Sequence, residues 1–322
     1  MKFSSYVHAF VLWALFCSPV SFAQSAFPSK PLKILVGYPA GGPVDVLARI
    51  YGMRLSKSID QPVIIENKPG ASGSMAADQM VKSPSDGYTL LLAPVTIAII
   101  SSLIPKLPYE TSTDLQAVAW IASAPFVLVS HPKLGFKNIP ELIAYAKNHP
   151  GEINFASASA GGIPHLAGEM FSAMAGVKMT HVPYKGAAPA TTDLLSGQVN
   201  LMFDSVVSAL PYIKSNRLIP LGVTGAKRLP LMPEVSPISE YLAGYEANGW
   251  YGFFIQKEAP KQIVQRLNQE INQLTKTAEV DQLIKSNGLD PVVTTPGEFA
   301  AYFTSEIAKW RRTVRSSDIK AD

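Results

Sequence analysis

Short apolar runs alternate along this chain with longer segments in which apolar residues recur every three or four positions. From residue 32 to residue 92, the short runs predict strands and the longer segments predict helices. The predicted strands are Leu32–Val36, Val63–Glu66 and Tyr88–Leu92, and the predicted helices are Val44–Ser58 and Met75–Lys82. This repeated order of strand, loop and helix predicts a parallel sheet with helices on both faces.

The same pattern returns between residues 126 and 223. The predicted strands are Phe126–Ser130, Ile153–Ala156, Met179–Val182, Leu201–Asp204 and Leu218–Val223. The predicted helices are Ile139–Asn148, His165–Ala175, a segment ending near Ser196, and Val206–Lys214. This stretch therefore predicts a second α/β unit.

The last part of the chain is mainly helical in its pattern. One predicted strand, Trp250–Ile255, precedes a helix over Lys261–Thr277, whose apolar residues are spaced by three or four. Two more helices follow, at Val280–Ser286 and Pro296–Arg315. We expect this tail to pack on the first unit, so that the second unit is inserted between two passes of the first.

The predicted fold is therefore α/β, with two domains. Each domain is expected to be a mostly parallel sheet flanked by helices, and two hinge strands near residues 121–130 and 245–256 join the domains. Residues 24–124 with 245–322 form the discontinuous first domain, and residues 125–244 form the second. A chain of 322 residues agrees with two domains of ordinary size.

Residues 1–23 have the features of a secretory signal peptide. Lys2 supplies a positive charge, Val7–Phe16 is a short and mostly apolar run, and Ser21-Phe22-Ala23 is a small-x-small cleavage site. The apolar run is too short to span a membrane, so an uncleaved anchor helix is the less favoured alternative. We expect cleavage after Ala23 and a periplasmic location.

Cleavage there changes the composition. It leaves 299 of the 322 residues and removes Lys2 and Cys17, so that the mature chain has no cysteine and has 27 basic against 24 acidic residues. A chain of this length can build a core without disulfides. The small positive balance suits anionic ligands and lacks the clustered basic stripe of nucleic-acid-binding proteins, so no nucleic-acid partner is expected.

The stretch from residue 33 to residue 50 combines a buried strand, a Gly/Pro loop and the start of a helix. Its loop reads Tyr38-Pro39-Ala40-Gly41-Gly42-Pro43. The two glycines allow positive φ and a close approach of ligand, and a proline suits the first helical turn. Because the first N–H groups of a helix have no intrahelical acceptor, this corner favours an anion, and we expect Gly41 and Gly42 to hold a carboxylate.

Loops at residues 37–43, 93–97, 157–164 and 184–189 follow predicted strands. In open α/β sheets, ligands lie beyond the carboxyl ends of the strands, so two facing sheets would line a cleft from both sides. The second domain offers further polar or backbone groups from Ser157, Ser159, Gly161, Gly162, Tyr184 and Lys185. Such a cleft suits a small ligand with a carboxylate at each end.

Several of these residues have a structural alternative. Asp45 is either an acceptor for an amine or amide of the ligand, which would select among ligands, or a first-turn acid stabilised by the helix dipole. Asp204 either lines the cleft or caps the helix that starts at Val206. For His165 the pattern favours packing or capping, and for Lys185 it favours solvent.

No constellation of catalytic or metal-ligating residues stands out. The histidines of the mature chain, at positions 131, 149, 165 and 181, lack metal-ligand spacing, and no catalytic-serine, dinucleotide or P-loop motif is present. We therefore predict no catalytic residue, no metal and no cofactor. Because a serine or aspartate in a cleft can still do chemistry, a secreted α/β hydrolase acting on an organic-acid ester remains the alternative.

Several stretches together resemble one family. The run PAGGPVDVLAR resembles the P-x-G-G-x-x-D-x-x-A-R signature of Bug-type receptors, the periplasmic solute-binding proteins of tripartite tricarboxylate transporters. The resemblance continues in order through QPVIIENKPGASGS, SPSDGYTLLL, HLAGEMF, VPYKGAAPATTDLLSGQV and GWYGFF, which covers nearly the whole mature chain.

The resemblance implies a two-domain flytrap of the periplasmic binding protein type, which closes on a small carboxylated molecule and delivers it to integral membrane subunits of a transporter. It places residues Tyr38 to Gly42 at a carboxylate held partly through ordered waters, and Asp45 at a polar group of the ligand. It places further cleft positions at the loop Ser157–Gly162, the turn at Tyr184-Lys185-Gly186, and Asp204. Signalling to a sensor, rather than uptake, is an alternative role, and we expect a monomer.

Two departures from the family pattern bear on the ligand. Family members often have Gly-Ser or Gly-Thr after the third strand, whereas this chain has Ala93-Pro94-Val95-Thr96, of which only Thr96 keeps a hydroxyl. Ile163 follows Gly162 where a small polar residue is common. Both departures favour a less polar carboxylate, aromatic or amide-bearing.

Overall fold

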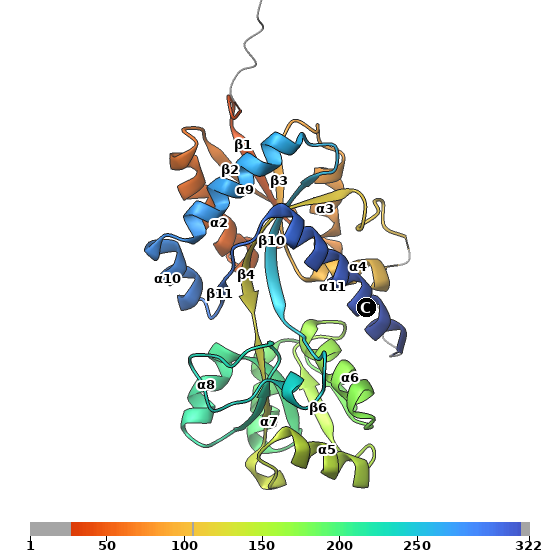
Figure 1. Ribbon diagram of the computed structural model, residues 1–322. Coiled ribbons are helices and arrows are strands. Elements are labelled where there is room, and N and C mark those ends of the chain that lie inside the picture. Colours follow the sequence, from red (N-terminus) through yellow and green to blue (C-terminus); the bar gives the residue numbers. More distant parts are fainter. Residues whose placement is uncertain (1–26, 105, 317–322) are drawn as a thin grey trace, which may run out of the picture.

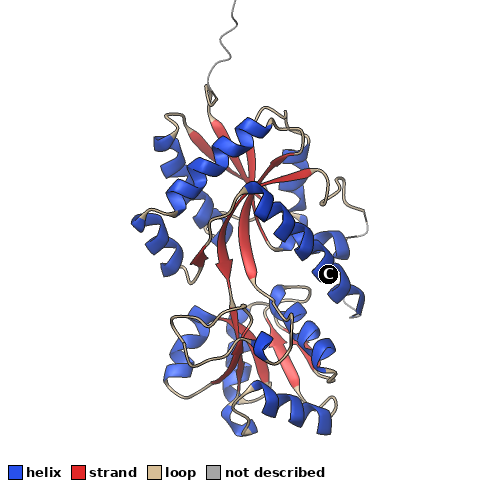
Figure 2. Ribbon diagram, viewed as in Figure 1, coloured by secondary structure: helices blue, strands red, loops and turns tan. Residues whose placement is uncertain are grey.

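The computed structural model describes residues 27–104 and 106–316, so the predicted signal peptide and its cleavage after Ala23 lie outside the described part. The described chain forms two lobes, one above the other in Figure 1. Each lobe is built around one sheet with helices on both faces, as the colours of Figure 2 show. We call the lobe with the six-stranded sheet the upper lobe and the lobe with the five-stranded sheet the lower lobe.

The upper sheet has the strand order β11-β4-β10-β3-β1-β2. Its strands are β1 (Leu32–Val36), β2 (Val63–Asn67), β3 (Thr89–Pro94), β4 (Leu115–Ala124), β10 (Gly249–Gln256) and β11 (Asp290–Pro291). β1 pairs in parallel with β2 and β3, whereas β10 is antiparallel to β3 and β4, and β11 is antiparallel to β4. The carboxyl ends of β1, β2 and β3 therefore lie together at the end of the sheet that faces the lower lobe (Figure 1).

Helices with apolar faces cover both sides of this sheet. Their bounds are α2 (Pro43–Ser58), α3 (Ser74–Val81), α4 (Thr96–Leu103), α9 (Lys261–Thr275), α10 (Ala278–Ser286) and α11 (Pro296–Ser316). α2, α9 and α10 pack in one buried cluster, and α3, α4 and α11 pack in another. The spacing of buried Val264, Leu267 and Ile271 in α9 is that of a helix with one buried side.

The lower sheet has the strand order β7-β6-β8-β5-β9. Its strands are β5 (Phe126–Ser130), β6 (Asn154–Ser157), β7 (Thr180–Pro183), β8 (Leu201–Ser205) and β9 (Ile219–Val223). One face is covered by α5 (Ile139–Asn148) and α6 (Ile163–Ala175), and the other by α7 (Ala187–Ser196) and α8 (Val206–Lys214). Short 3-10 helices are η1 (Ala71–Gly73), η2 (Pro132–Leu134) and η3 (Ile238–Glu240).

The predicted α/β fold class is confirmed, but the expectation of mostly parallel sheets is wrong. Each sheet has two parallel strand pairs, and its other pairs are antiparallel. The reason is the path of the chain between the lobes. β10 enters the upper sheet from the lower lobe, and β5 enters the lower sheet from the upper lobe. β10 and β5 therefore each start at the end of the sheet where the parallel strands finish, and they run antiparallel to those strands.

The structure also contains a helix that the pattern did not predict. The sequence predicts a loop over residues 93–97, whereas β3 runs to Pro94 and α4 begins at Thr96. The segment TIAIISSL has consecutive apolar residues from Ile97 to Ile100, and all of them are buried. A helix that is buried on nearly every side has no polar face, so the spacing of apolar residues that indicates a helix is not visible in its sequence.

Two connections join the lobes, and they touch each other. Pro125 alone separates β4 from β5, and β10 starts directly after Asn248. The Thr224 hydroxyl accepts a hydrogen bond from the N–H of Phe126 (2.8 Å) and donates one to Oδ1 of Asn248 (3.0 Å). The crossing points are thus tied together. The domain bounds at residues 124/125 and 244/245 stay a prediction.

α11 is fastened to β10 by a buried carboxylate. Oε2 of Glu306 accepts hydrogen bonds from Nε1 of Trp250 and of Trp310, each at 2.9 Å, and Oε1 pairs with Lys309. Glu306 is only 2% exposed. One carboxylate therefore satisfies two buried indole donors, which fixes the last helix across the sheet.

We expect Glu306→Ala to lower the free energy of unfolding by about 3–5 kcal/mol, because two buried indole N–H groups and a partly buried ammonium would lose their acceptor. Urea unfolding followed by tryptophan fluorescence measures this. The control is Glu298→Ala, which removes an exposed carboxylate that caps the same helix and should cost clearly less stability. A loss for Glu306→Ala no larger than that of the control would contradict the proposed anchor.

Candidate functional site

The loops that follow β1, β2 and β3 meet at the end of the upper sheet that faces the lower lobe. The first two touch through their backbones, because a Cβ on Gly37 would lie 2.5 Å from Cα of Gly73. Only glycine fits at such an approach. The loop after β2 is also strained, with φ of 45° at Ala71 and 52° at Ser72. A strained turn of this kind persists because its neighbours hold it.

These loops bring together Tyr38 and Thr96, two residues that the sequence assigns to the site. The Tyr38 hydroxyl donates to the carbonyl oxygen of Ser72 (3.0 Å) and therefore accepts from the hydroxyl of Thr96 (2.5 Å). Burial raises the pKa of Tyr38, an effect that the hydrogen bond with Thr96 partly opposes. The phenol is thus a neutral group that links the three loops.

Asp45 is 2% exposed and has its partners within the chain. Oδ2 accepts from the N–H of Gly41 and from Nε of Arg49, each at 2.8 Å, and Oδ1 accepts from Nδ2 of Asn67 at 3.0 Å. The same Asn67 amide donates to the carbonyl oxygen of Tyr38 (3.0 Å). The hydrogen bond from Arg49, with those from Gly41 and Asn67, lowers the pKa of Asp45 to about 2. This geometry favours the structural alternative, and a direct contact with ligand stays a prediction.

The N–H groups that lack an acceptor differ from those that the sequence assigns to an anion. Gly41 has a φ of +82°, but its N–H is bonded to Asp45. Gly42 has a φ of −77° and its N–H donates to the carbonyl oxygen of Pro39 at 3.4 Å, so the prediction of positive φ is wrong for this residue. In the described part of the chain, the N–H groups of Val44 and Asp45, in the first turn of α2, have no hydrogen-bond acceptor.

In the lower lobe, the loops after β6 and β7 lie side by side. The N–H of Tyr184 donates to the carbonyl oxygen of Ser157 and that of Gly186 to the carbonyl oxygen of Ala158, each at 2.9 Å. Gly161 has a φ of +70°, and its N–H donates to Nδ1 of His165 at 3.0 Å. The predicted loop at residues 157–162 is therefore held by its neighbour and by the start of α6.

Two stacked imidazole rings lie beneath this loop. The ring centroids of His165 and His181 are 3.5 Å apart and the rings are nearly parallel, at 9°. The Ser157 hydroxyl donates to the carbonyl oxygen of Ser159 (2.8 Å), so Nε2 of His181 donates to it (2.6 Å). Burial and the neighbouring His165 lower the pKa of His181 to about 4, although Glu169 opposes this. His181 is therefore held neutral at pH 7.

The other predicted residues of the lower lobe are differently placed. The Tyr184 hydroxyl donates to Oδ2 of Asp193 (2.7 Å), and burial together with that carboxylate raises the pKa of Tyr184 to about 12. Ser159 and Lys185 are exposed, as is Ala40 in the upper lobe. The Tyr184 side chain thus points toward α7, whereas the side chains of Ser159 and Lys185 remain accessible to solvent.

Asp204 ends β8 and is 4% exposed. Its Oδ1 accepts from the N–H of Ser205 (2.8 Å), and its Oδ2 is buried with no hydrogen-bond partner among the described residues. Burial raises the pKa of Asp204, which Ser208 and the Ser205 N–H oppose. The side chain that caps α8 is Ser205, which accepts from the N–H of Ser208 (3.2 Å), so the capping alternative for Asp204 is wrong.

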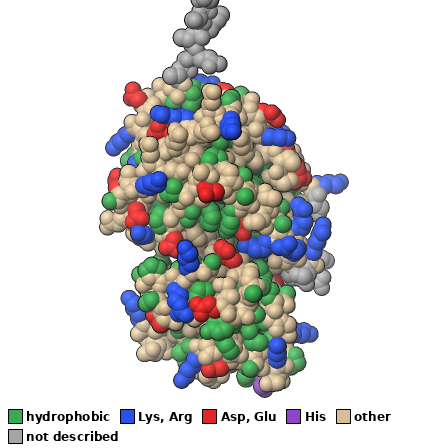
Figure 3. Space-filling view, in the orientation of Figure 1, with side chains coloured by type: hydrophobic (Ala, Val, Ile, Leu, Met, Phe, Trp, Pro, Cys, Tyr) green, Lys and Arg blue, Asp and Glu red, His purple; other side chains and the backbone are tan. Residues whose placement is uncertain are grey.

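A cavity of about 410 Å³ lies between the lobes at the start of α2. Its lining includes Gly41 and Pro43 from the upper lobe, Ser205 and Val207 from the lower lobe, and Pro125 between them. The lower loop also approaches the upper lobe, since a Cβ on Gly161 would lie 3.4 Å from Cδ1 of Leu103 in α4. The outline of the molecule narrows at this level in Figure 3.

Sequence reasoning did not assign Asn67, Ser72, His181 or Ser205 to the site. Asn67 is the clearest omission, because its amide bonds both Asp45 and the backbone of Tyr38. A polar residue directly at the end of an apolar strand was a usable signal for it. His181 lies inside a strand, and nothing local to it indicates a ring that stacks on another histidine.

Among residues 27–104 and 106–316, no three histidine, cysteine, aspartate or glutamate side chains are grouped in a way that could hold a metal ion. No helix of this part of the chain combines the length and the hydropathy needed to cross a membrane.

The lowered pKa of His181 predicts an acid-sensitive stability. Because the pKa of His181 is about 4 in the fold and 6.5 in the unfolded chain, the unfolded chain binds more protons between these values. Stability should therefore be full above pH 6.5 and fall as the pH drops toward 4, by up to about 3 kcal/mol. His181→Gln should remove this slope, as measured by urea unfolding at several pH values. A slope that persists in His181→Gln, and matches that of the control His149→Gln, would contradict the assignment.

Comparison with known proteins agrees with this architecture. Residues 47–319 match the tripartite tricarboxylate transporter family receptor. Protein BugT of Bordetella pertussis is 34% identical over 318 residues, covering 97% of this chain and 96% of BugT. A solved R. palustris structure with adipate is 31% identical, with a TM-score of 0.72, covering 91% of this chain and 99% of that chain.

MatC from Rhodopseudomonas palustris, solved with bound malate, is 28% identical with a TM-score of 0.68, covering 89% of this chain and 100% of that chain. The resemblance to Bug-type receptors is thereby confirmed. The chain belongs to the tripartite tricarboxylate transporter receptor family, whose members are periplasmic solute-binding proteins.

Proposed function

We propose that this receptor binds a small dicarboxylate between its lobes and delivers it to the integral membrane subunits of a tripartite tricarboxylate transporter. One carboxylate would lie at the first turn of α2, and the other at the loop of residues 157–161. The adipate and malate bound by related structures support a dicarboxylate. Closure of the lobes around the ligand would bring the two loops together.

The observation that carries this proposal is the open end of α2. The N–H groups of Val44 and Asp45 lack an acceptor in the described chain, and Gly41 and Pro43 beside them line the cavity between the lobes. Unpaired donors at a helix N-terminus favour an anion through both hydrogen bonds and the helix dipole. The buried carboxylate of Asp45 would hold this loop in place rather than meet the ligand.

The residues that favour an aromatic or amide-bearing ligand in the sequence are buried. Ala93 and Val95 are each 4% exposed and Ile163 is 6% exposed, so they pack in the core. Thr96, beside Tyr38, is the polar group left at this position. We therefore propose an aliphatic dicarboxylate as the first choice, with aromatic and amide-bearing acids as comparison ligands.

We further propose that the receptor acts as a monomer in the periplasm after cleavage behind Ala23, and that it binds without turnover. The Ser157–His181 hydrogen bond is a contact that a serine hydrolase would use. Ser157, however, is fully buried and its hydroxyl donates to a backbone carbonyl, so a substrate has no access to it. This favours binding over catalysis.

The test is calorimetric titration of the mature protein, freed of ligand by unfolding and refolding, against a panel of acids. The panel contains C4 to C6 dicarboxylates, their monoamides, matched monocarboxylates and benzoates. We expect one or a few dicarboxylates to bind and to raise the melting temperature by mass action on the folded state. Preference for monocarboxylates, or consumption of any acid or its ester, would overturn the proposal.

Gly41→Val should weaken dicarboxylate binding by about tenfold or more, because a β-branched residue at positive φ strains the loop and displaces the start of α2. Gly135→Val is a matched control. Both glycines have φ near +80° with no atom within 4 Å of an added Cβ, but Gly135 lies at the far end of the lower lobe. The two variants should lose similar stability. Equal affinity of both variants and the parent would exclude a role for the first loop.

Asp45→Asn separates the two interpretations of this residue. If the carboxylate positions the loop, every acid in the panel should lose affinity by about the same factor, about tenfold, since one of the hydrogen bonds to Gly41 or Asn67 is lost. If it contacts the ligand, the order of preference among acids and monoamides should change instead. Titration of the same panel decides, and a changed order would contradict the positioning role.

A further inference from the structure

One edge of the upper sheet is open. β4 pairs with β10 along its whole length, but on its other side β11 pairs only with Ser123 and Ala122. Among the described residues, no strand covers this side of β4 from Leu115 to Ala117, whereas Val118 and Ala119 are fully buried. An uncovered edge strand exposes backbone donors and acceptors that can pair with an added strand.

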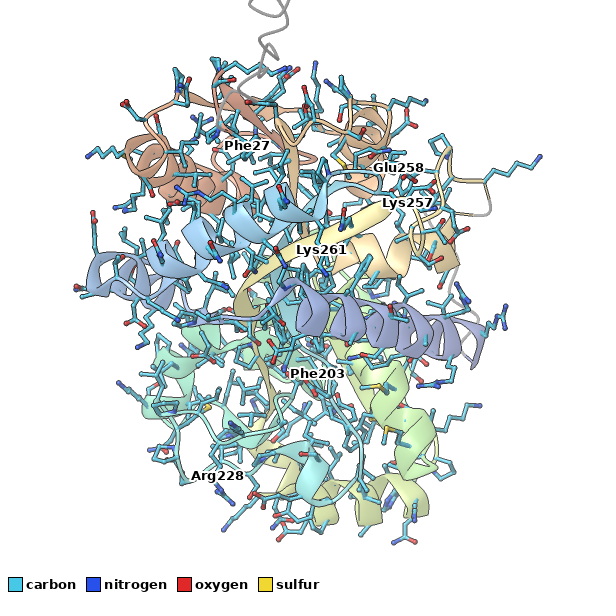
Figure 4. All side chains as sticks on the ribbon, turned by 45° about the horizontal axis from the view of Figure 1, so that its top comes forward. Phe27, Phe203, Arg228, Lys257, Glu258 and Lys261 are labelled. Carbon is cyan, nitrogen blue, oxygen red and sulfur yellow. The ribbon has the colours of Figure 1, made fainter. Side chains whose placement is uncertain are left out.

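A groove of about 910 Å³ lies along this open edge, between α9 and the start of α11. Its apolar floor includes Leu115 and Ala117 of β4 and Val264 of α9. Figure 4 shows β4 passing between the two helices, with Lys257 and Lys261 labelled beside it. The open stretch, Leu115–Ala117, is three residues long, which is the length of a short β-strand.

Two side chains near the groove already form hydrogen bonds with this edge of β4. Nδ2 of Asn268 donates to the carbonyl oxygen of Val118 (2.7 Å), and the hydroxyl of Thr294 accepts from the N–H of Trp120 (3.4 Å). These contacts replace part of a missing strand. Oε1 of Gln116, which lines the groove, is buried and has no hydrogen-bond partner in the described chain. It is an acceptor that a backbone N–H of an added strand would satisfy.

The charge of the groove is of one sign. Its lining contains two lysines, Lys257 and Lys261, and no aspartate or glutamate. Neither lysine has an ion-pair partner among the described residues. The first turns of α9 and α11, which also border the groove, add the positive end of their dipoles. The groove is thus complementary to carboxylates.

We propose that the open edge of β4 is a docking site for an extended, acidic peptide segment of another protein. The segment would add as a strand beside Leu115–Ala117 and place carboxylates at Lys257 and Lys261. A second copy of this chain is disfavoured, because two such edges would bring four lysines together. An extended, acidic segment of a membrane subunit would bind the receptor at this edge of β4.

The docking site and the solute cleft lie at opposite ends of the upper sheet. Leu115 of β4 pairs with Gln256, whereas the loop after β3 begins at Pro94, which pairs with Tyr251. Partner binding would therefore leave the cleft free. This separation makes the docking proposal independent of the identity of the solute.

The experiment is NMR titration of isotope-labelled mature protein with a synthetic heptapeptide, acetyl-Thr-Glu-Val-Glu-Val-Glu-Thr-amide. We expect saturable shifts confined to the amides of Leu115–Ala117 and the start of α9. A peptide with lysine at the three glutamates tests charge. A peptide with proline at the two valines keeps the charge but removes backbone donors. Both should fail to bind.

Two double variants complete the test. Lys257→Glu with Lys261→Glu should weaken peptide binding by about tenfold or more. Lys227→Glu with Lys276→Glu changes the net charge equally at exposed positions away from the groove and should leave it unchanged. Equal melting temperatures exclude misfolding. Absence of saturable shifts, binding of the lysine peptide, equal effects of both double variants, shifts centred on the loops at residues 38–45, or dimerisation through β4 would each overturn the proposal.

Discussion

Antiparallel pairing of β10 with both β3 and β4 is the constraint on which the rest of the structure depends. This strand carries the chain from the lower lobe into the middle of the upper sheet, and Trp250, Phe253 and Phe254 on it are fully buried. β3 and β4 pair with β10 on its two sides and so fix its register. The position of the first residues of β10 therefore determines where the chain passes from the lower lobe into the upper lobe. Gly252 leaves room for the ring of Phe299, which seats α11 on the same strand.

The loop of residues 38–45 shows how a buried carboxylate can fix the shape of a loop that we propose as a binding loop. The carboxylate of Asp45 takes the N–H of Gly41 and the amide of Asn67, and that amide holds the backbone of Tyr38. The loop is therefore set before any ligand arrives, and the open donors are main-chain N–H groups of a helix. Such donors cannot rotate away, which lowers the cost of ordering the site on binding.

The two ends of the upper sheet have different chemistry. At the carboxyl ends of β1 and β3, loops and a helix terminus face the lower lobe, so any ligand there is enclosed from both sides. At the other end, β4 offers an uncovered edge beside Lys257 and Lys261. On the two proposals made above, one sheet would separate recognition of a small solute from recognition of a larger partner, because its strands have chemically different ends.

Local pattern was enough to find the elements whose period is visible in neighbouring residues. α2 was predicted from Val44 to Ser58 and runs from Pro43 to Ser58. The same holds for the loops of residues 38–43 and 157–162, since Gly, Pro and Ser mark turns directly in the sequence. The family signature added the two-domain architecture and the receptor function.

What the sequence by itself determined about this protein is the order of its elements, its α/β class and the positions of its loops, because these depend on periodicity and turn residues within a few positions. Only the tertiary structure decided the mixed sheets, the buried α4, the partners of Asp45 and the stacking of His165 on His181. Asn67 lies 22 residues from Asp45 in sequence, and no local pattern encodes that pairing. The physical reason is that hydrogen-bond partners, burial and strand direction are set by which distant segments pack together.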